Sequence, residues 1–429
     1  MINKSNVNGM SGDRHSIILS KKITIRYIAY QIIYFAYASG ISSFAATYLL
    51  AKGLNASQVG MLLAISNLMA CFGQPIVGDI VDRLKNFVLP RILAGVFAGV
   101  LICLSVIQFL NPPLAVVGLL YGTVLFISSM TNSLNNSLCA YYTNRGCAVN
   151  YGVGQGVGSF SFSVASLGFG YVMAWLGVDS MIWIVFVLAL FMIIVVLGYP
   201  KVEDLGVKKY EDNCEDLHNC RNSAVTAEKS AAMDERVSII EFFGKYKLFV
   251  VTMGGVMLVS MCHYISENYF IAIFEKIGGG SEDVGIAMFV ACSSAVPFFL
   301  FFEKMREKID IYTFLKLAGI FFMLKTGLIM LATEVWHIYL IQLLQTFTYG
   351  FIYQPLYYMA RRLISEADLV KGQAVAISMY TLGGACGSFA GGRILDMYGI
   401  DAMLWLALGV ACAGAIIINL TLRKDRVRI

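Results

Sequence analysis

The chain has 429 residues, of which 58% are hydrophobic and only 14% are charged, and its mean hydropathy is +0.72. Soluble globular domains carry about 25% charged residues, so these values exclude an ordinary soluble protein. The formal net charge of +5 would suit a nucleic-acid partner, but the distribution of the charges, described below, argues against one. No nucleophile–base arrangement, metal-ligand spacing or phosphate loop is found, so we expect neither an enzyme nor a cofactor.

Apolar runs of roughly 17–25 residues, long enough to cross a bilayer, recur along the whole chain. Only helices and closed barrels satisfy their backbone groups in lipid, and runs of this length indicate helices. The sequence predicts an all-α integral membrane protein with twelve transmembrane helices, arranged as two pseudo-symmetric six-helix bundles around a central cavity. In chain order the spans are expected at 26–50, 57–80, 88–110, 113–139, 151–175, 179–199, 246–274, 284–302, 312–332, 335–358, 373–395 and 401–422.

The basic residues are distributed unevenly between the loops. If the N-terminus lies inside, the inner loops, the tails and the adjoining helix ends hold 28 of the 32 Lys and Arg residues. The outer loops hold only Lys52 and Lys276. This bias follows the positive-inside rule, so both termini are expected in the cytoplasm and the basic charge reflects topology.

The predicted domains follow from this pattern. We expect a cytoplasmic N-terminal tail (1–25), a first bundle (26–199), a cytoplasmic central loop (200–245), a second bundle (246–422) and a cytoplasmic tail (423–429). Residues 1–22 contain no apolar core, so no cleavable signal peptide is expected. Within the central loop, Cys214, His218 and Cys220 form CEDLHNC, for which a metal site and a solvated loop with reduced thiols are the two interpretations; we favour the second.

The two predicted bundles are related by an internal repeat. The segment SLGFGYVMAWLGVDSMIWI (166–184) aligns without gaps onto SFAGGRILDMYGIDAMLWL (388–406). Two related six-helix halves joined by a cytoplasmic loop are typical of transporters that rock around a midplane site. The coinciding pairs are Ser166/Ser388, Gly170/Gly392, Gly177/Gly399, Asp179/Asp401, Met181/Met403 and Trp183/Trp405.

One loop carries a recognisable motif. The stretch QPIVGDIVDRLKN (74–86), at the inner end of the second span, is similar to the loop signature of the major facilitator superfamily: Gly, three residues, Asp, then Arg or Lys. It matches at Gly78, Asp82 and Arg83. Within the superfamily, the second span, the YG at 151–152 and the CHY at 262–264 resemble the lactose permease and oligosaccharide–proton symporter group.

The resemblance implies a monomeric secondary transporter in the inner (cytoplasmic) membrane. It also implies that Gly78, Asp82 and Arg83 form a conformational latch, which holds the inner side closed during part of the cycle. A solvated Asp–Arg turn is the simpler alternative. The glycine and the twelve-span setting favour the latch.

Two charges lie deep inside predicted spans. A charge at the bilayer centre costs about 2.5–3.5 kcal/mol on insertion scales, so such residues are functional candidates. Glu267 lies eight residues before Glu275 and Lys325 eight residues before Thr333, so at about 1.5 Å per residue both are expected at similar depth. Four other charged residues lie near span ends, where charge costs less: Asp79, Asp179, Arg393 and Asp396.

We therefore expect Glu267 and Lys325 to face the central cavity as a pair, with Glu267 taking up and releasing a coupling proton. Burial raises the pKa of a carboxylate in general and a nearby cation lowers it, so opening and closing the cavity would switch the proton. His263, four residues before Glu267, is on the same helical face and would relay the proton or hydrogen-bond a neighbouring helix. The alternative is a static ion pair that joins two helices.

Polar and aromatic residues at helical spacing predict the wall of the cavity. Such side chains need partners inside a bilayer, and gathered together they suit a neutral polyhydroxylated solute such as a sugar or nucleoside. The alternative is helix packing by small and polar residues. The candidate substrate-binding residues are Tyr30, Tyr34, Asn136, Gln155, Tyr264, Asn268 and Gln345.

The chain departs from the lactose permease pattern where the galactoside is bound. The resemblance places the group's glutamate and arginine positions at Ser137 and Gln155, which are uncharged. The expected function is therefore proton-coupled symport of a neutral sugar or similar solute, with import or export left open. The alternatives are an exporter or facilitator of another small organic solute (nucleoside, metabolite or drug) and a non-transporting membrane sensor.

Overall fold

The structure is a computed structural model that describes residues 5–83, 89–143, 149, 151–199 and 239–422. All of the regular structure in these residues is helical. The N-terminal elements are α1 (Ser5–Ala38), the π-helical turn η1 (Ser39–Ser43), α2 (Ala45–Ala51), α3 (Ala56–Arg83), α4 (Leu89–Phe109), α5 (Leu114–Thr143), α6 (Tyr151–Leu176) and α7 (Ser180–Leu197).

The elements after the central loop are more often broken. They are α9 (Ile239–Lys245), α10 (Lys247–Asn268), α11 (Phe270–Lys276), α12 (Ser281–Lys308), α13 (Ile311–Leu331), α14 (Val335–Gln342), the π-helical turn η3 (Thr346–Gly350), α15 (Phe351–Leu363), the short 3-10 turn η4 (Glu366–Asp368) and α16 (Leu369–Thr421).

The membrane class of the fold is confirmed, but the count of twelve spans is not. Among the described residues, nine helices are long and apolar enough to cross a membrane, or ten if the bent pair Lys21–Ser43 and Ala45–Ala51 counts as one span. The predicted span 335–358 is divided into α14, η3 and α15, none of which alone has the length of a span. The last two predicted spans are joined in α16, where Gly399 interrupts the helix with φ 80°.

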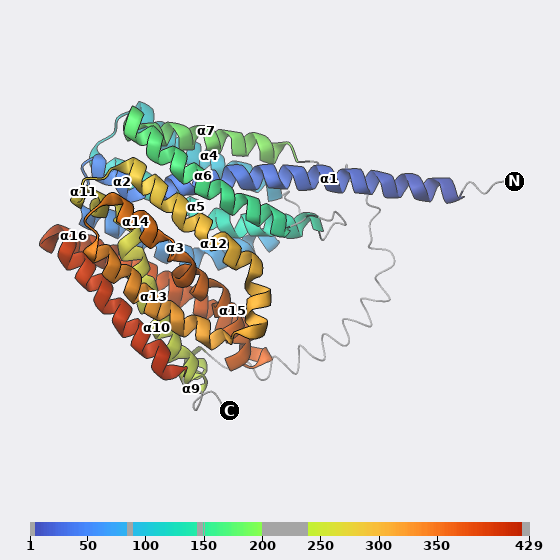
Figure 1. The fold of residues 1–429 in the computed structure, drawn as a ribbon. Coiled ribbons are helices and arrows are strands. Elements are labelled where there is room, and N and C mark those ends of the chain that lie inside the picture. The colour runs from blue at the N-terminus through green and yellow to red at the C-terminus, as the bar shows by residue number, and fades with distance from the viewer. Residues whose placement is uncertain (1–4, 84–88, 144–148, 150, 200–238, 423–429) are drawn as a thin grey trace.

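The helix α1 begins at Ser5, well before the predicted start of the first span at residue 26. Figure 1 shows it projecting beyond the other helices toward the N-terminus. Once a helix has nucleated, each added residue gains a backbone hydrogen bond at little further cost, so the apolar part of α1 can continue into the polar residues before it.

The helices pack in two groups. In the N-terminal group (α1 to α7), α1 contacts α6 and α7, α3 contacts α5, and α4 contacts α5 and α7. In the C-terminal group (α9 to α16), α10 packs along α16, and α13 contacts α15 and α16. The groups meet where α3 packs on α16 and α6 packs on α12.

The contacts between the groups are gathered toward one end of the molecule. We call this end, which carries Lys52 and Lys276, the Lys52 end, and the opposite end, which carries Asp368, the Asp368 end. In Figure 1, α6 and α12 lie together near the Lys52 end, at the left, and diverge toward the Asp368 end. The molecule is therefore closed at the Lys52 end.

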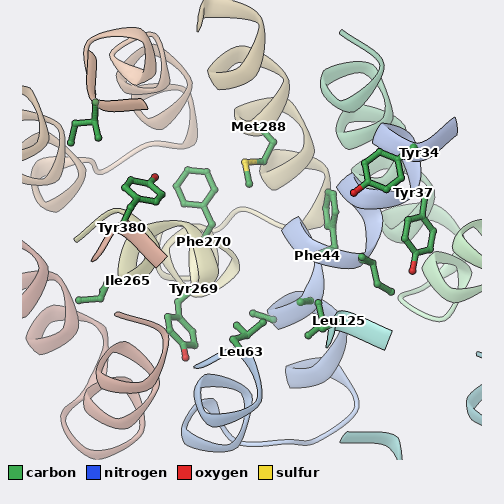
Figure 2. Close-up of a cluster of buried hydrophobic side chains, with 14 of the residues drawn as sticks. Tyr34, Tyr37, Phe44, Leu63, Leu125, Ile265, Tyr269, Phe270, Met288 and Tyr380 are labelled. Atoms are coloured by element: carbon green, nitrogen blue, oxygen red, sulfur yellow. The ribbon is translucent and has the colours of Figure 1, made fainter. Parts of the chain in front are cut away.

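Aromatic side chains fill the interior of both groups. Figure 2 shows Tyr380, Phe270 and Met288 of the C-terminal group at the left and centre of the view, with Tyr34 and Tyr37 of α1 at the right. All five are at most 9% exposed. Burying rings of this size is the largest apolar contribution that single side chains make to a core.

Candidate functional site

The two deep charges meet the same side chain. Gln345, at the end of the segment between α14 and η3, accepts a hydrogen bond at Oε1 from Lys325 Nζ over 2.5 Å. It donates from Nε2 to Glu267 Oε1 over 2.9 Å. The amide thus joins α10, α13 and the η3 segment through one carboxylate, one ammonium and one glutamine.

Glu267 and Lys325, which the sequence predicts as a pair at matching depth, share one partner instead of contacting each other directly. Among the described residues, Glu267 and Lys325 form no ion pair within 4.0 Å. Gln345 lies between them, so the two charges interact through an amide dipole. Lys325 is 5% exposed and Gln345 is 7% exposed, whereas the side chain of Glu267 retains 21% of its exposure. The carboxylate is the accessible end of this network.

His263 lies beside the carboxylate, one helical turn before it on α10. Its Nδ1 is 3.5 Å from Glu267 Oε1, which is longer than a well-formed hydrogen bond. Its ring stacks on Tyr349, with centroids 5.7 Å apart, and meets the edge of Phe322. The imidazole is therefore held by aromatic packing, at a distance that a small shift would convert into a hydrogen bond to Glu267.

The local backbone explains how Gln345 reaches both charges. Gln345 directly precedes the π-helical turn η3, which begins at Thr346. A π turn inserts one residue into a helix and changes the direction of the side chains around it, and such turns occur often at functional sites. Thr348, within the turn, donates to Gln345 Oε1 over 3.4 Å and orients the amide further.

A cluster of tyrosines surrounds this network on the C-terminal group. Tyr349 and Tyr353 stack with centroids 5.2 Å apart, and both meet Tyr380 edge to face. The predicted Tyr264 is half-buried and packs edge to face on Tyr380. The hydroxyl of Tyr380 is buried and has no hydrogen-bond partner among the described residues.

The predicted residues of the N-terminal group are distributed differently. Tyr30 and Tyr34 stack with centroids 6.0 Å apart on α1 and are 0% and 6% exposed. Gln155, on α6, is half-buried. Asn136 belongs to α5, but its side chain lies outside the described residues. Among the described residues, Tyr30 forms no hydrogen bond, ion pair or ring contact with Glu267, Gln345 or Lys325.

The side chain of Asn268 joins two helices in this structure. Its Nδ2 donates to Ser388 Oγ of α16 over 2.7 Å, and Ser388 is fully buried. The bond fastens the end of α10 to α16. Asn268 therefore binds α16 here, whereas Glu267 beside it binds Gln345.

Two predicted features lie outside the description. Gly78, Asp82 and Arg83 belong to the last turns of α3, but their side chains are not among the described ones. The Cys214, His218 and Cys220 segment falls in residues 200–238, which are also outside. Within the described residues, no cluster of three or more His, Cys, Asp or Glu could hold a metal ion.

The N-terminal and C-terminal groups contact each other at glycines that occupy equivalent positions in the internal repeat. A Cβ on Gly60 of α3 would lie under 3.0 Å from the carbonyl oxygen of Ser388. A Cβ on Gly285 of α12 would also lie under 3.0 Å from the carbonyl oxygen of Ser166. Ser166 and Ser388 are a repeat pair, and ASQVG (56–60) corresponds to SEDVG (281–285). Only glycine permits backbones to approach this closely.

The reciprocal contacts follow the same symmetry. A Cβ on Gly392 would clash with the carbonyl oxygen of Ala56, and one on Gly170 with that of Ser281. Gly170 and Gly392 are again a repeat pair. The Lys52 end is thus closed by two equivalent glycine contacts, α3 on α16 and α6 on α12.

Two ion pairs at the Lys52 end are also equivalent in the repeat. Lys52 binds Asp179 over 2.5 Å, and Lys276 binds Asp401. These are the two lysines that the charge distribution assigns to outer loops. The pairing was not predicted, although the alignment of Asp179 with Asp401 was a signal that could have found it.

Comparison with known proteins agrees with this architecture. The family model described as the MFS_1 like family matches residues 25–406. A curated relative, the uncharacterized transporter YwbF of Bacillus subtilis (strain 168), is 24% identical over 390 residues, which cover 86% of each chain.

Solved structures show the same fold. The nucleoside transporter NupG superposes with a TM-score of 0.70 at 14% identity, over 93% of this chain and 98% of that one. The POT family transporter PepTSo superposes with a TM-score of 0.70 at 12% identity, over 95% and 99% of the two chains. Since the family model covers most of the chain, the protein belongs to the MFS_1 like family and is a membrane transporter of the major facilitator type.

Proposed function

We propose that the protein is a proton-coupled symporter of a neutral, polyhydroxylated solute such as a sugar, working by alternating access. The observation that carries the proposal is the network Lys325–Gln345–Glu267, a buried lysine and a half-buried carboxylate joined through one amide. Deep ionisable residues that face one another are typical of proton and ion pathways in transporters.

In this proposal Glu267 takes up and releases the coupling proton. Its carboxylate is the most exposed member of the network, so it is the one that a proton can reach from an open end. Lys325 balances the negative charge while Glu267 is ionised. Gln345 keeps the lysine from closing on the carboxylate, and His263 stands beside Glu267 as the residue that passes the proton on.

The aromatic cluster and the two stacked tyrosine pairs would hold the solute. Tyr264, Tyr349, Tyr353 and Tyr380 offer apolar faces with hydroxyl edges, a combination that binds sugar rings through their C–H faces and their hydroxyls. Tyr30, Tyr34, Asn136 and Gln155 are proposed for the opposite wall, and Asn268 for a state in which its bond to Ser388 is released. The proposed solute has no formal charge, because Glu267 and Lys325 balance one another.

Nucleoside transport is the second candidate. The stacked pair Tyr349–Tyr353, with rings 20° apart, is an aromatic surface on which a planar base could stack. The structural similarity to the nucleoside transporter NupG is compatible with this candidate. A solute panel that includes both classes separates them.

The remaining parts of the proposal follow the charge distribution. We place the Lys52 end outside and the Asp368 end and both termini in the cytoplasm, within the inner membrane. Residues 26–199 and 246–422 are proposed as the two moving bundles of a monomer. Gly78, Asp82 and Arg83 are proposed as the latch that closes the cytoplasmic end in the opposite state.

The experiment measures proton movement and solute movement together. Protein in sealed vesicles receives a panel of monosaccharides, disaccharides and nucleosides, while external pH is recorded on each addition. One solute is expected to make the external medium more alkaline. In E267Q, accumulation and the pH change should be lost, whereas exchange of the solute at equal concentrations should persist.

The matched control is E275Q, the same substitution at an exposed position eight residues further along the chain. It should behave like the wild type. Solute uptake without a pH change, or E267Q with unchanged pH movement, would contradict proton coupling through Glu267. A response only to nucleosides would replace the sugar proposal by the second candidate.

A further inference from the structure

One carboxylate at the Lys52 end connects the two groups and has no counterpart in the repeat. Asp396, on α16, accepts hydrogen bonds from the backbone N–H groups of Ala56 over 2.9 Å and Ser57 over 2.6 Å. These are the first two residues of α3. The repeat position of Asp396 in the N-terminal group is Ala174, so the second glycine contact lacks such a carboxylate.

The composition of the two helix starts explains the difference. The first N–H groups of a helix have no partner within it and carry partial positive charge, so a carboxylate there is stabilising. α12 supplies its own, because Glu282 and Asp283 lie in its first turn and Asp283 accepts from the N–H of Gly280. α3 has no acidic residue in its first turn.

The negative charge for α3 therefore comes from the other group. Gln58 and Asn55 cap one another at the start of α3, Gln58 accepting from the N–H of Asn55 and Asn55 from the N–H of Gln58. This arrangement provides oxygen acceptors but no charge. The carboxylate of Asp396 completes the helix start only while α16 lies against α3.

We infer that Asp396 is an outer latch, a carboxylate that stabilises the state closed at the Lys52 end because it binds the start of α3 across the two groups. The contact around it is close: the Tyr269 hydroxyl lies 3.4 Å from the carbonyl oxygen of Ala56 in the other group, and Gly392 leaves no room for a Cβ against Ala56. Separating the groups at this end breaks both hydrogen bonds that Asp396 accepts from α3. The start of α12 keeps the negative charge of Glu282 and Asp283 in either state.

The inference rests on the alternate opening of the two ends that the proposed function assumes, but not on protons or on a particular solute. A carboxylate at a helix start is worth an equilibrium shift of about 2- to 30-fold. Removing the charge should shift the population toward the state open at the Lys52 end by a factor in this range.

The test is hydrogen–deuterium exchange of the purified full-length protein, followed by peptide mass spectrometry. In D396N, amides around Gly170 and Gly285 should exchange faster by about 2- to 30-fold, although Asp396 does not touch them. Amides at the Asp368 end should exchange more slowly. D401N is the matched control: it removes an acid at the same end, one that pairs with Lys276, and should leave both regions unchanged.

A second variant changes the start of α3, the segment that Asp396 binds. Q58D gives α3 an acid at the position where α12 has Asp283. The new carboxylate provides negative charge at the start of α3 in both states, and in the closed state it repels Asp396. It should open the Lys52 end in the same way, and adding it to D396N should have little further effect.

Faster exchange confined to the peptide that contains Ala56 and Ser57, with unchanged amides around Gly170 and Gly285, would overturn the inference and leave a local helix cap. Equal and additive effects of D396N and Q58D would overturn it too. Neither result depends on whether the vesicle experiment detects a proton, so failure of the coupling proposal and failure of the latch are distinguishable.

Discussion

Glu267 and Lys325 share one amide: Gln345 accepts from Lys325 Nζ over 2.5 Å and donates to Glu267 Oε1 over 2.9 Å. A glutamine has one end of each polarity, so it satisfies an ammonium and a carboxylate at once. The arrangement spaces two opposite charges in a setting where direct contact would be strong.

Removing the Gln345 amide, which bridges Lys325 and Glu267, should lower the thermal stability of the protein. Q345L leaves the Lys325 ammonium, which is 5% exposed, without its acceptor, and an unmet buried polar group costs about 1–3 kcal/mol or more. The variant should therefore melt at lower temperature in detergent. The double variant K325M/Q345L should recover part of the loss, because apolar groups replace both partners; a double variant less stable than Q345L would contradict the bridge.

The glycine contacts predict that G60V favours the state open at the Lys52 end. Even a Cβ at this position would lie under 3.0 Å from the backbone of Ser388, so a branched side chain cannot fit in the closed state. Hydrogen exchange around Gly392 should rise. G254V is the control, since a Cβ there meets nothing within 4 Å. Unchanged exchange in G60V would contradict the prediction, because the contact would then accommodate the valine without separation of the two groups.

A buried acid at the Asp368 end predicts a dependence on pH. Burial raises the pKa of the Asp368 carboxyl, but hydrogen bonds from Lys245 and Tyr246 outweigh this effect and hold the pKa below its ordinary range. A depressed carboxyl pKa contributes stability at pH values above the unfolded pKa, and that stability is lost as the pH falls through the folded value.

D368N should accordingly lower the melting temperature most near neutral pH. The difference from the wild type should shrink as the pH falls below about 4, because the wild-type carboxyl then also loses its charge. Melting curves at several pH values measure it. A difference that stays constant down to pH 3 or grows on acidification would contradict the assignment.

The ion pairs at the Lys52 end should contribute little to stability. The side chains of Lys52 and Asp179 are 34% and 58% exposed, and those of Lys276 and Asp401 are 40% and 71% exposed. Exposed pairs are typically worth about 0–1 kcal/mol. K52M and K276M should each leave the melting temperature nearly unchanged, and a large loss in either would show that the pair holds its loop in place.

Much of the molecule could be predicted from the sequence because the bilayer restricts what an apolar segment can be. Long uncharged runs indicate membrane helices, and two ionisable residues inside such runs stand out. Equal distance from the span ends placed Glu267 and Lys325 at one depth. The segment 166–184 and its repeat 388–406 placed equivalent glycines and aspartates in the two halves.

The tertiary structure decided which of these residues meet. Whether Lys325 contacts Glu267 directly or through Gln345 depends on the π turn that begins at Thr346, and such a turn leaves no periodic signal in the sequence. Asp396 lies 339 residues from Ser57, so no local pattern could join them. Span depth and helix type follow from the local balance of apolar and polar groups, whereas contacts between helices depend on how whole faces pack. For that reason the sequence alone determined the membrane helices and the candidate charges, and only the fold decided their partners.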